Sequence, residues 1–180
     1  VDLRAGLSDG DADSAMAVAR RAAGRRTIAC VGRALRKDLR AQKRKSAFEN
    51  GLATQGLHFV AEQLDDGFSS IALGKRLTAE LLAARPQLDC IYYSNDDMAA
   101  GGLFACMEHG IAVPSQIVLA GFNGLDLTGS LPAPIATRKS PRRAMGEAAA
   151  RLITEAIKND GETGPQTIPR SEERRAGEAR

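Results

Sequence analysis

Short apolar runs alternate along the chain with segments whose apolar residues recur every three or four positions. The short runs, rich in β-branched residues, predict strands at 27–32, 58–64, 89–94, 117–122 and 135–140. The periodic segments predict helices at 11–23, 41–55, 70–84, 97–110 and 142–158. Strand and helix therefore alternate, which predicts an α/β fold built from right-handed βαβ units, with a parallel sheet flanked by helices.

Polar residues follow each predicted strand, where sheets of this kind bind their ligands. They are Arg40 and Arg44 in a basic segment, then Asp65, Asp66, Asn95, Asp96, Asn123 and Ser140. These positions offer hydrogen-bond donors but no cysteine or histidine, so we expect no metal and no cofactor. The set favours a polyhydroxylated or anionic small molecule. Arg44 in particular can bind a carboxylate or diol through two hydrogen bonds, whereas we expect Asp96 to cap the helix after it.

Composition excludes several classes of protein. Of the 180 residues, 43% are hydrophobic and 26% are charged, which is typical of a soluble globular domain and not of a disordered chain. The three cysteines lack a CxxC spacing, which argues against a disulfide framework or zinc ribbon and favours a cytoplasmic location. A net charge of +3 and 4% aromatic residues argue against nucleic-acid binding by this chain alone.

One catalytic pattern is present, the GxSxG sequence of residues 6–10, which would make Ser8 a nucleophile. Only seven residues precede Ser8, which leaves no room for the upstream strand that supplies the oxyanion loop of such hydrolases. The two histidines, His58 and His109, are better explained as surface or strand-end residues. A serine hydrolase remains a minor alternative, and we expect the chain not to be an enzyme.

The helix at 97–109 is apolar almost all round. One face would cover the sheet, and the opposite face is too apolar for exposure to water, which predicts a subunit interface. A deeply buried helix is the alternative.

Several segments resemble the effector-binding core of the lactose-repressor/galactose-repressor (LacI/GalR) family of transcription factors. The clearest are YSNDDMAAG at 93–101, GIAVP at 110–114 and IVLAGFN at 117–123. Further matching segments are 24–32, 44–48, 134–137, 141–146, 148–149 and 152–153. The resemblance covers residues 6–158 in order, and it is closest to the gluconate-operon repressor branch.

The resemblance implies a periplasmic-binding-protein-like fold of two lobes with the effector between them. Residues 24–141 would form a nearly complete C-terminal lobe, 1–23 and 142–169 part of the N-terminal lobe, and 170–180 a charged tail. We expect the chain, which starts at Val1, to be a piece of a cytoplasmic repressor that binds operator DNA only through an N-terminal helix-turn-helix domain outside it. A periplasmic sugar-binding protein of a transporter shares the fold and is the alternative.

The family's functional positions can be carried over to this sequence. The cleft arginine falls on Arg44, and Asn123 stands where the family has an acidic residue, which favours an anionic effector such as a sugar acid. The full set of expected ligand-binding residues is Asp11, Arg44, Phe68, Ser69, Asn95, Asn123 and Ser140. The family pairs through this lobe, so we expect a homodimer with Ser70, Ala100, Leu103, Phe104, Met107, Leu127 and Leu131 at its interface.

Overall fold

The computed structural model describes residues 5–7, 24–34, 39–138, 140, 142–158, 166–168 and 173–174. The predicted helix at 11–23, the expected ligand residue Asp11 and Ser8 of the GxSxG pattern lie outside the described residues. In the described part of the chain, no helix is long and apolar enough to cross a membrane.

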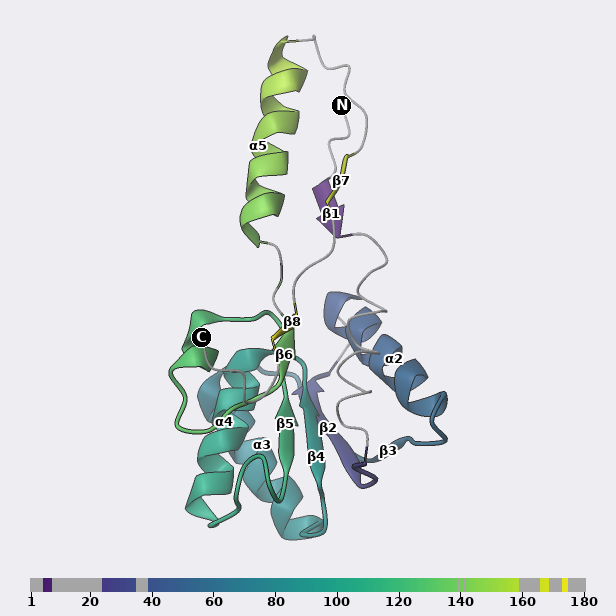
Figure 1. The fold of residues 1–180 in the computed structure, drawn as a ribbon, viewed down its shortest axis with the longest axis vertical. Coiled ribbons are helices and arrows are strands. Elements are labelled where there is room, and N and C mark those ends of the chain that lie inside the picture. The colour runs from purple at the N-terminus through teal and green to yellow at the C-terminus, as the bar shows by residue number, and fades with distance from the viewer. Residues whose placement is uncertain are drawn as a thin grey trace.

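A four-stranded parallel sheet, drawn in the lower part of Figure 1, lies between helices. Its strands, in the spatial order β3-β2-β4-β5, are Phe59–Asp65, Ile28–Arg33, Cys90–Tyr93 and Val118–Ala120. Ala120 also bridges in parallel to Ala136, just before the two-residue strand β6 (Thr137–Arg138). The predicted parallel sheet is confirmed, although the last strand is much shorter than the predicted 135–140.

Helices cover both faces of this sheet, as the alternating pattern predicted (Figure 1). Helix α2 (Leu39–Ala53) lies on one face, where the Phe48 ring stacks on Tyr92 of β4 with 4.3 Å between ring centroids. Helices α3 (Ile71–Ala84) and α4 (Asp96–Glu108) lie on the other face, over a core cluster that includes Val31 and Ile91. Successive residues of the inner strands β2 and β4 thus enter different cores, which accounts for their nearly continuous apolar sequences, whereas the edge strand β3 carries the exposed Glu62.

Helix α4 packs closely against α3, and this contact corrects one prediction. Ala100 and Leu103 were expected at an outer face, but they are 0% and 1% exposed within the single chain. They cannot meet a partner subunit in this conformation, and the buried-helix alternative holds for that face. Phe104 is half-buried and Met107 is 52% exposed, so the accessible apolar surface of α4 is smaller than its composition suggested.

A second group of elements is drawn apart from the sheet in Figure 1. Strand β1 (Ala5–Leu7) pairs in parallel with β7 (Gln166–Ile168), and α5 (Arg142–Lys158) contacts both. The predicted charged tail contributes β8 (Glu173–Arg174), which pairs antiparallel with β6. The assignment of 1–23 and 142–169 to part of an N-terminal lobe stays a prediction.

Candidate ligand site at the strand ends

Arg44 reaches from α2 over the carboxyl ends of two strands. Its Nη2 donates a hydrogen bond of 3.3 Å to the carbonyl oxygen of Ser94, which follows β4. Its guanidinium carbon lies 4.6 Å from the ring centroid of Phe122, which follows β5. Its Nε is buried and has no hydrogen-bond partner. A buried donor without an acceptor is costly, so a ligand acceptor at this atom would stabilise the site.

The structure corrects the prediction that Asp96, which follows β4, caps the next helix. Asn95, not Asp96, caps α4, because its Oδ1 accepts a 3.0 Å hydrogen bond from the Met98 amide. Asp96 is fully buried and accepts hydrogen bonds from the Thr137 hydroxyl and from the Leu125 amide. Burial raises the pKa of the Asp96 carboxyl. Asp96 therefore ties the loop after β5 to the start of α4 rather than facing a ligand.

Asn123 and Ser140 are held side by side by main-chain hydrogen bonds. The Asn123 amide donates to the Arg138 carbonyl at 3.0 Å, and the Asn123 carbonyl accepts from the Ser140 amide at 3.0 Å. Asn123 has a φ of 117°, a conformation uncommon for residues other than glycine but tolerated by asparagine. Asn123 directly follows Phe122, on which Arg44 stacks, and Asn95 directly follows Ser94, to which Arg44 donates. Three of the expected ligand residues, Asn95, Asn123 and Ser140, thus lie at the strand ends near Arg44.

Two other expected residues, Phe68 and Ser69, lie on the loop between β3 and α3. The Phe68 side chain is 88% exposed, and Ser69 is half-buried. The guanidinium carbon of Arg33 lies 5.6 Å from the Phe68 ring centroid. Arg33 directly follows the predicted strand 27–32, yet it was not among the expected site residues; the structure places it as the last residue of β2.

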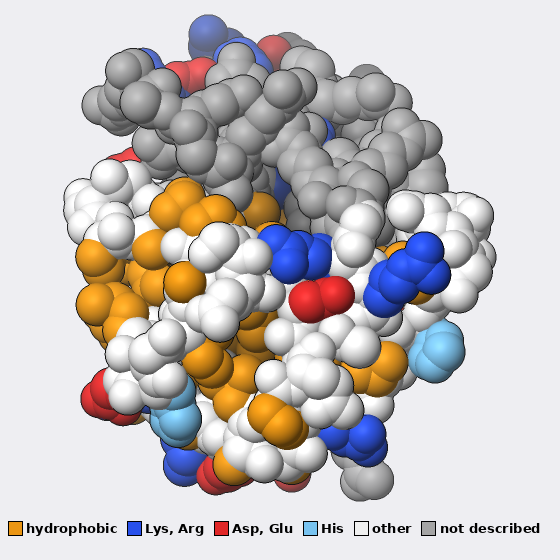
Figure 2. All heavy atoms as spheres, turned by 60° about the horizontal axis from the view of Figure 1, so that its bottom comes forward, with side chains coloured by type: hydrophobic (Ala, Val, Ile, Leu, Met, Phe, Trp, Pro, Cys, Tyr) orange, Lys and Arg blue, Asp and Glu red, His pale blue; other side chains and the backbone are white. Residues whose placement is uncertain are grey.

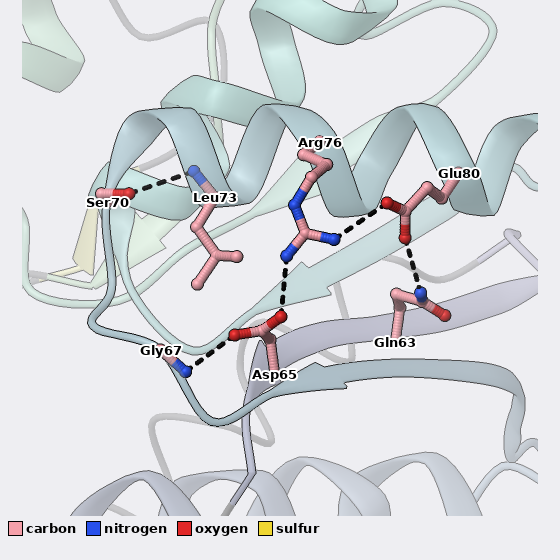
Figure 3. Close-up of polar contacts among 7 residues, drawn as sticks. All are labelled: Gln63, Asp65, Gly67, Ser70, Leu73, Arg76 and Glu80. Carbon is pink, nitrogen blue, oxygen red and sulfur yellow. Dashed lines mark hydrogen bonds and ion pairs between the residues drawn. The ribbon is translucent and has the colours of Figure 1, made fainter.

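Asp65, the last residue of β3, has both carboxylate oxygens engaged by hydrogen bonds within the chain. Figure 3 shows Asp65 accepting one hydrogen bond from the Gly67 amide and another from Arg76 of α3, each 2.7 Å long. These donors lower the pKa of the Asp65 carboxyl. Arg76 also pairs with Glu80 at 2.9 Å, so the loop that carries Phe68 is fastened to α3.

The described residues offer no activated nucleophile at these strand ends. Cys30, Cys90 and Cys106 are buried, and burial raises the pKa of the Cys90 thiol to about 12 and that of Cys106 to about 11. Burial also raises the pKa of the Cys30 thiol. His109 follows α4 and its Nδ1 lies 2.8 Å from the Ala105 carbonyl, away from the strand ends. The arrangement suits binding of a polar ligand.

Comparison with known sequences relates the chain to transcriptional regulators. The profile of the periplasmic binding protein-like domain matches residues 20–176. The regulator IdnR of Escherichia coli K12 is 41% identical over 92 residues, which are 51% of this chain and 28% of the relative. The regulator GntR of Pseudomonas aeruginosa is 36% identical over 137 residues, which are 76% of this chain and 39% of the relative.

Solved structures give the same relationship. A LacI-family transcriptional regulator from Silicibacter pomeroyi is 36% identical, with a TM-score of 0.83 over 93% of this chain and 51% of its own. GntR from Chromobacterium violaceum is 30% identical, with a TM-score of 0.80 over 88% of this chain and 59% of its own. The chain spans about half or less of the length of most of these relatives. The named relatives are regulators, which supports the regulator hypothesis and not the transporter alternative. The chain belongs to the periplasmic binding protein-like domain family, and the relatives named here are transcriptional regulators.

Proposed function

We propose that the chain is the effector-sensing core of a LacI-type repressor and that its effector is a sugar acid or a related polyhydroxylated anion. The observation that carries the proposal is Arg44, a fixed cation at the strand ends whose buried Nε has no partner. The relatives of the chain are named as transcriptional regulators. The described site holds no activated nucleophile, so the role that we propose is binding and not catalysis.

The effector carboxylate binds the Arg44 guanidinium in this proposal, with two parallel hydrogen bonds. Asn95 uses its Oδ1 for the helix cap, so its amide nitrogen remains to donate to a hydroxyl group. Asn123 and Ser140 offer further polar groups from the ends of β5 and β6. An amide at position 123 does not repel an anion, as a carboxylate would.

Effector binding then changes the relative position of two lobes, and this change alters the affinity of a DNA-binding domain for its operator. That domain lies outside the chain, so the proposal assigns no specific DNA binding to these 180 residues. As a DNA-binding regulator, the protein acts in the cytoplasm.

We also propose that the protein forms a homodimer through the exposed side of α4. Figure 2 shows hydrophobic side chains gathered on the side of the molecule where Figure 1 draws α4. Met107 is exposed there, and Phe104 is half-buried. Leu127 of the 3-10 helix Asp126–Gly129 and Leu131 are half-buried as well. Ser70 is exposed at the start of α3, where its hydroxyl caps the helix.

Isothermal titration calorimetry with D-gluconate and D-glucitol tests the effector proposal. The two compounds have the same six-carbon chain and differ in the acid group. We expect wild type to bind D-gluconate at least about tenfold more tightly, because a shielded hydrogen bond to a charged group contributes about 1.5–3 kcal/mol. Arg44→Gln should remove the difference. Arg85→Gln is the matched control, because Arg85 is exposed at the far end of α3.

Two results would refute this proposal. Equal affinities of the wild-type protein for the acid and the polyol would show that no cation selects the ligand. Retention of the preference for D-gluconate in Arg44→Gln would show that another group binds the acid.

A further inference from the structure

Arg33 is a second arginine at the strand ends with unused hydrogen-bonding capacity. It is the last residue of β2, the strand between β3 and β4. Its side chain is half-buried, and its Nε is buried without a hydrogen-bond partner. The same combination marks Arg44. Two partly buried guanidinium groups, each with an unpartnered Nε, lie beyond the carboxyl ends of one sheet.

The two arginines lie on opposite faces of the sheet. Side chains alternate along a strand, and Val31 belongs to the core cluster under α3 and α4, so Arg33 points to that face. Arg44 comes from α2, which covers the other face. Their aromatic neighbours differ as well. Phe68 follows the edge strand β3 and Phe122 follows β5, which is three strand spacings away, or about 14 Å.

The acidic residue next to Arg33 does not neutralise it. Asp65 is the register partner of Arg33 in the β2–β3 pair. Both of its carboxylate oxygens are engaged elsewhere, one by the Gly67 amide and one by Arg76 (Figure 3). The same contacts fix the turn that carries Phe68 over Arg33. The ion pair with Arg76 therefore leaves the Arg33 guanidinium available to a ligand and places an exposed aromatic ring beside it.

We propose that Arg33 is a second anion-binding residue of the site and that the preferred effector carries a carboxylate at each end of a polyhydroxylated chain. The inference rests on the proposed function. Arg44 binds one carboxylate and Arg33 the other, while the Phe68 ring covers the second end. Guanidinium groups on opposite faces of the sheet suit an extended ligand with two charges better than a single carboxylate shared by both.

Calorimetric titration with D-gluconate and D-glucarate tests the inference, because the two compounds differ only in having one or two terminal carboxylates. We expect wild type to bind D-glucarate at least about tenfold more tightly than D-gluconate, as a second charged hydrogen-bonded pair implies. Arg33→Gln should bring the ratio of the two affinities close to one. Arg26→Gln should keep the wild-type ratio, because Arg26 is exposed just before the opposite end of β2.

Arg33→Lys is the second variant, since it keeps the charge but loses the planar fork, and we expect an intermediate ratio. Thermal melting of each variant shows that it is folded. A wild-type ratio near one, or an unchanged ratio in Arg33→Gln, would overturn the inference while leaving the Arg44 proposal intact. Failure of both acids to bind wild type, or indifference of D-gluconate binding to Arg44→Gln, would instead overturn the proposed function, and this inference with it.

Discussion

Replacement of Gly101 by alanine should destabilise the protein, although alanine is the better helix former. Gly101 lies in α4 where this helix meets α3. A Cβ atom at this position would lie 2.1 Å from the Ile71 carbonyl oxygen and 2.6 Å from the Lys75 amide nitrogen. Both atoms belong to the main chain of α3, so no side-chain rotation can relieve the contact. The two helices would have to move apart.

The size of the effect follows from this geometry. Relief to a separation of 3.0 Å requires a shift of about 0.9 Å, the difference between 3.0 and 2.1 Å. A gap of 0.5–1 Å forfeits a quarter to a half of the dispersion energy of the atoms involved, and overpacking typically costs about 1–3 kcal/mol. The higher helix propensity of alanine offsets about 1 kcal/mol of this cost. Because the contacts are with main-chain atoms, the cost lies at the upper end of this range, and we expect a net loss of about 2 kcal/mol in the free energy of unfolding.

Urea unfolding followed by far-ultraviolet circular dichroism measures this loss, and Gly146→Ala is the matched control. Gly146 lies in α5, and a Cβ atom there would have no other atom within 4 Å. Gly146→Ala should therefore stabilise the protein by about 0.5–1 kcal/mol. The two substitutions are chemically identical and should have opposite signs. If Gly101→Ala proved as stable as wild type, the close approach of α3 and α4 would be wrong.

Two further predictions concern Asp96 and the dimer. The fold raises the pKa of the Asp96 carboxyl above 3.8. The protonated carboxyl therefore contributes its full share of folding stability below pH 3.8, and this share is lost as the pH rises through the folded-state pKa. The stability of wild type relative to Asp96→Asn should fall as the pH rises above 3.8 in urea titrations, and a relative stability that rises would contradict this. Light scattering should show wild type and Phe68→Glu as dimers and Phe104→Glu as a monomer. A wild-type protein that is already a monomer, with a mass that Phe104→Glu leaves unchanged, would refute the proposed interface.

The sequence predicts the helices and strands well where local pattern determines them. The α3 and α4 boundaries differ from the predicted ones by only one or two residues, because apolar spacing and flanking Pro and Gly mark them. The burial of Ala100 and Leu103 could not be seen in this way. It depends on the close approach of α3, which a glycine in each helix permits: Gly74 and Gly101 both face main-chain atoms of the other helix.

The candidate site was predicted in part. Arg44 was expected at the strand ends, and it lies there. Asp96 was expected to cap α4, but Asn95 caps it. The Asp96 carboxylate is instead held by Thr137, which lies 41 positions away in the sequence. Arg33 was missed because its significance comes from two distant features, the ring of Phe68 beside it and the ion pair that occupies Asp65. Neither contact can be predicted from the residues next to Arg33 in the sequence.

A crystal structure with D-gluconate bound is the most direct test of the central claim, that Arg44 holds the acid group of the effector at the strand ends. We expect the carboxylate oxygens to lie about 2.7–2.9 Å from the guanidinium nitrogens of Arg44. The hydroxyl groups should lie against Asn95, Asn123 and Ser140. A ligand bound elsewhere, or one whose carboxylate points away from Arg44 toward solvent, would contradict the account.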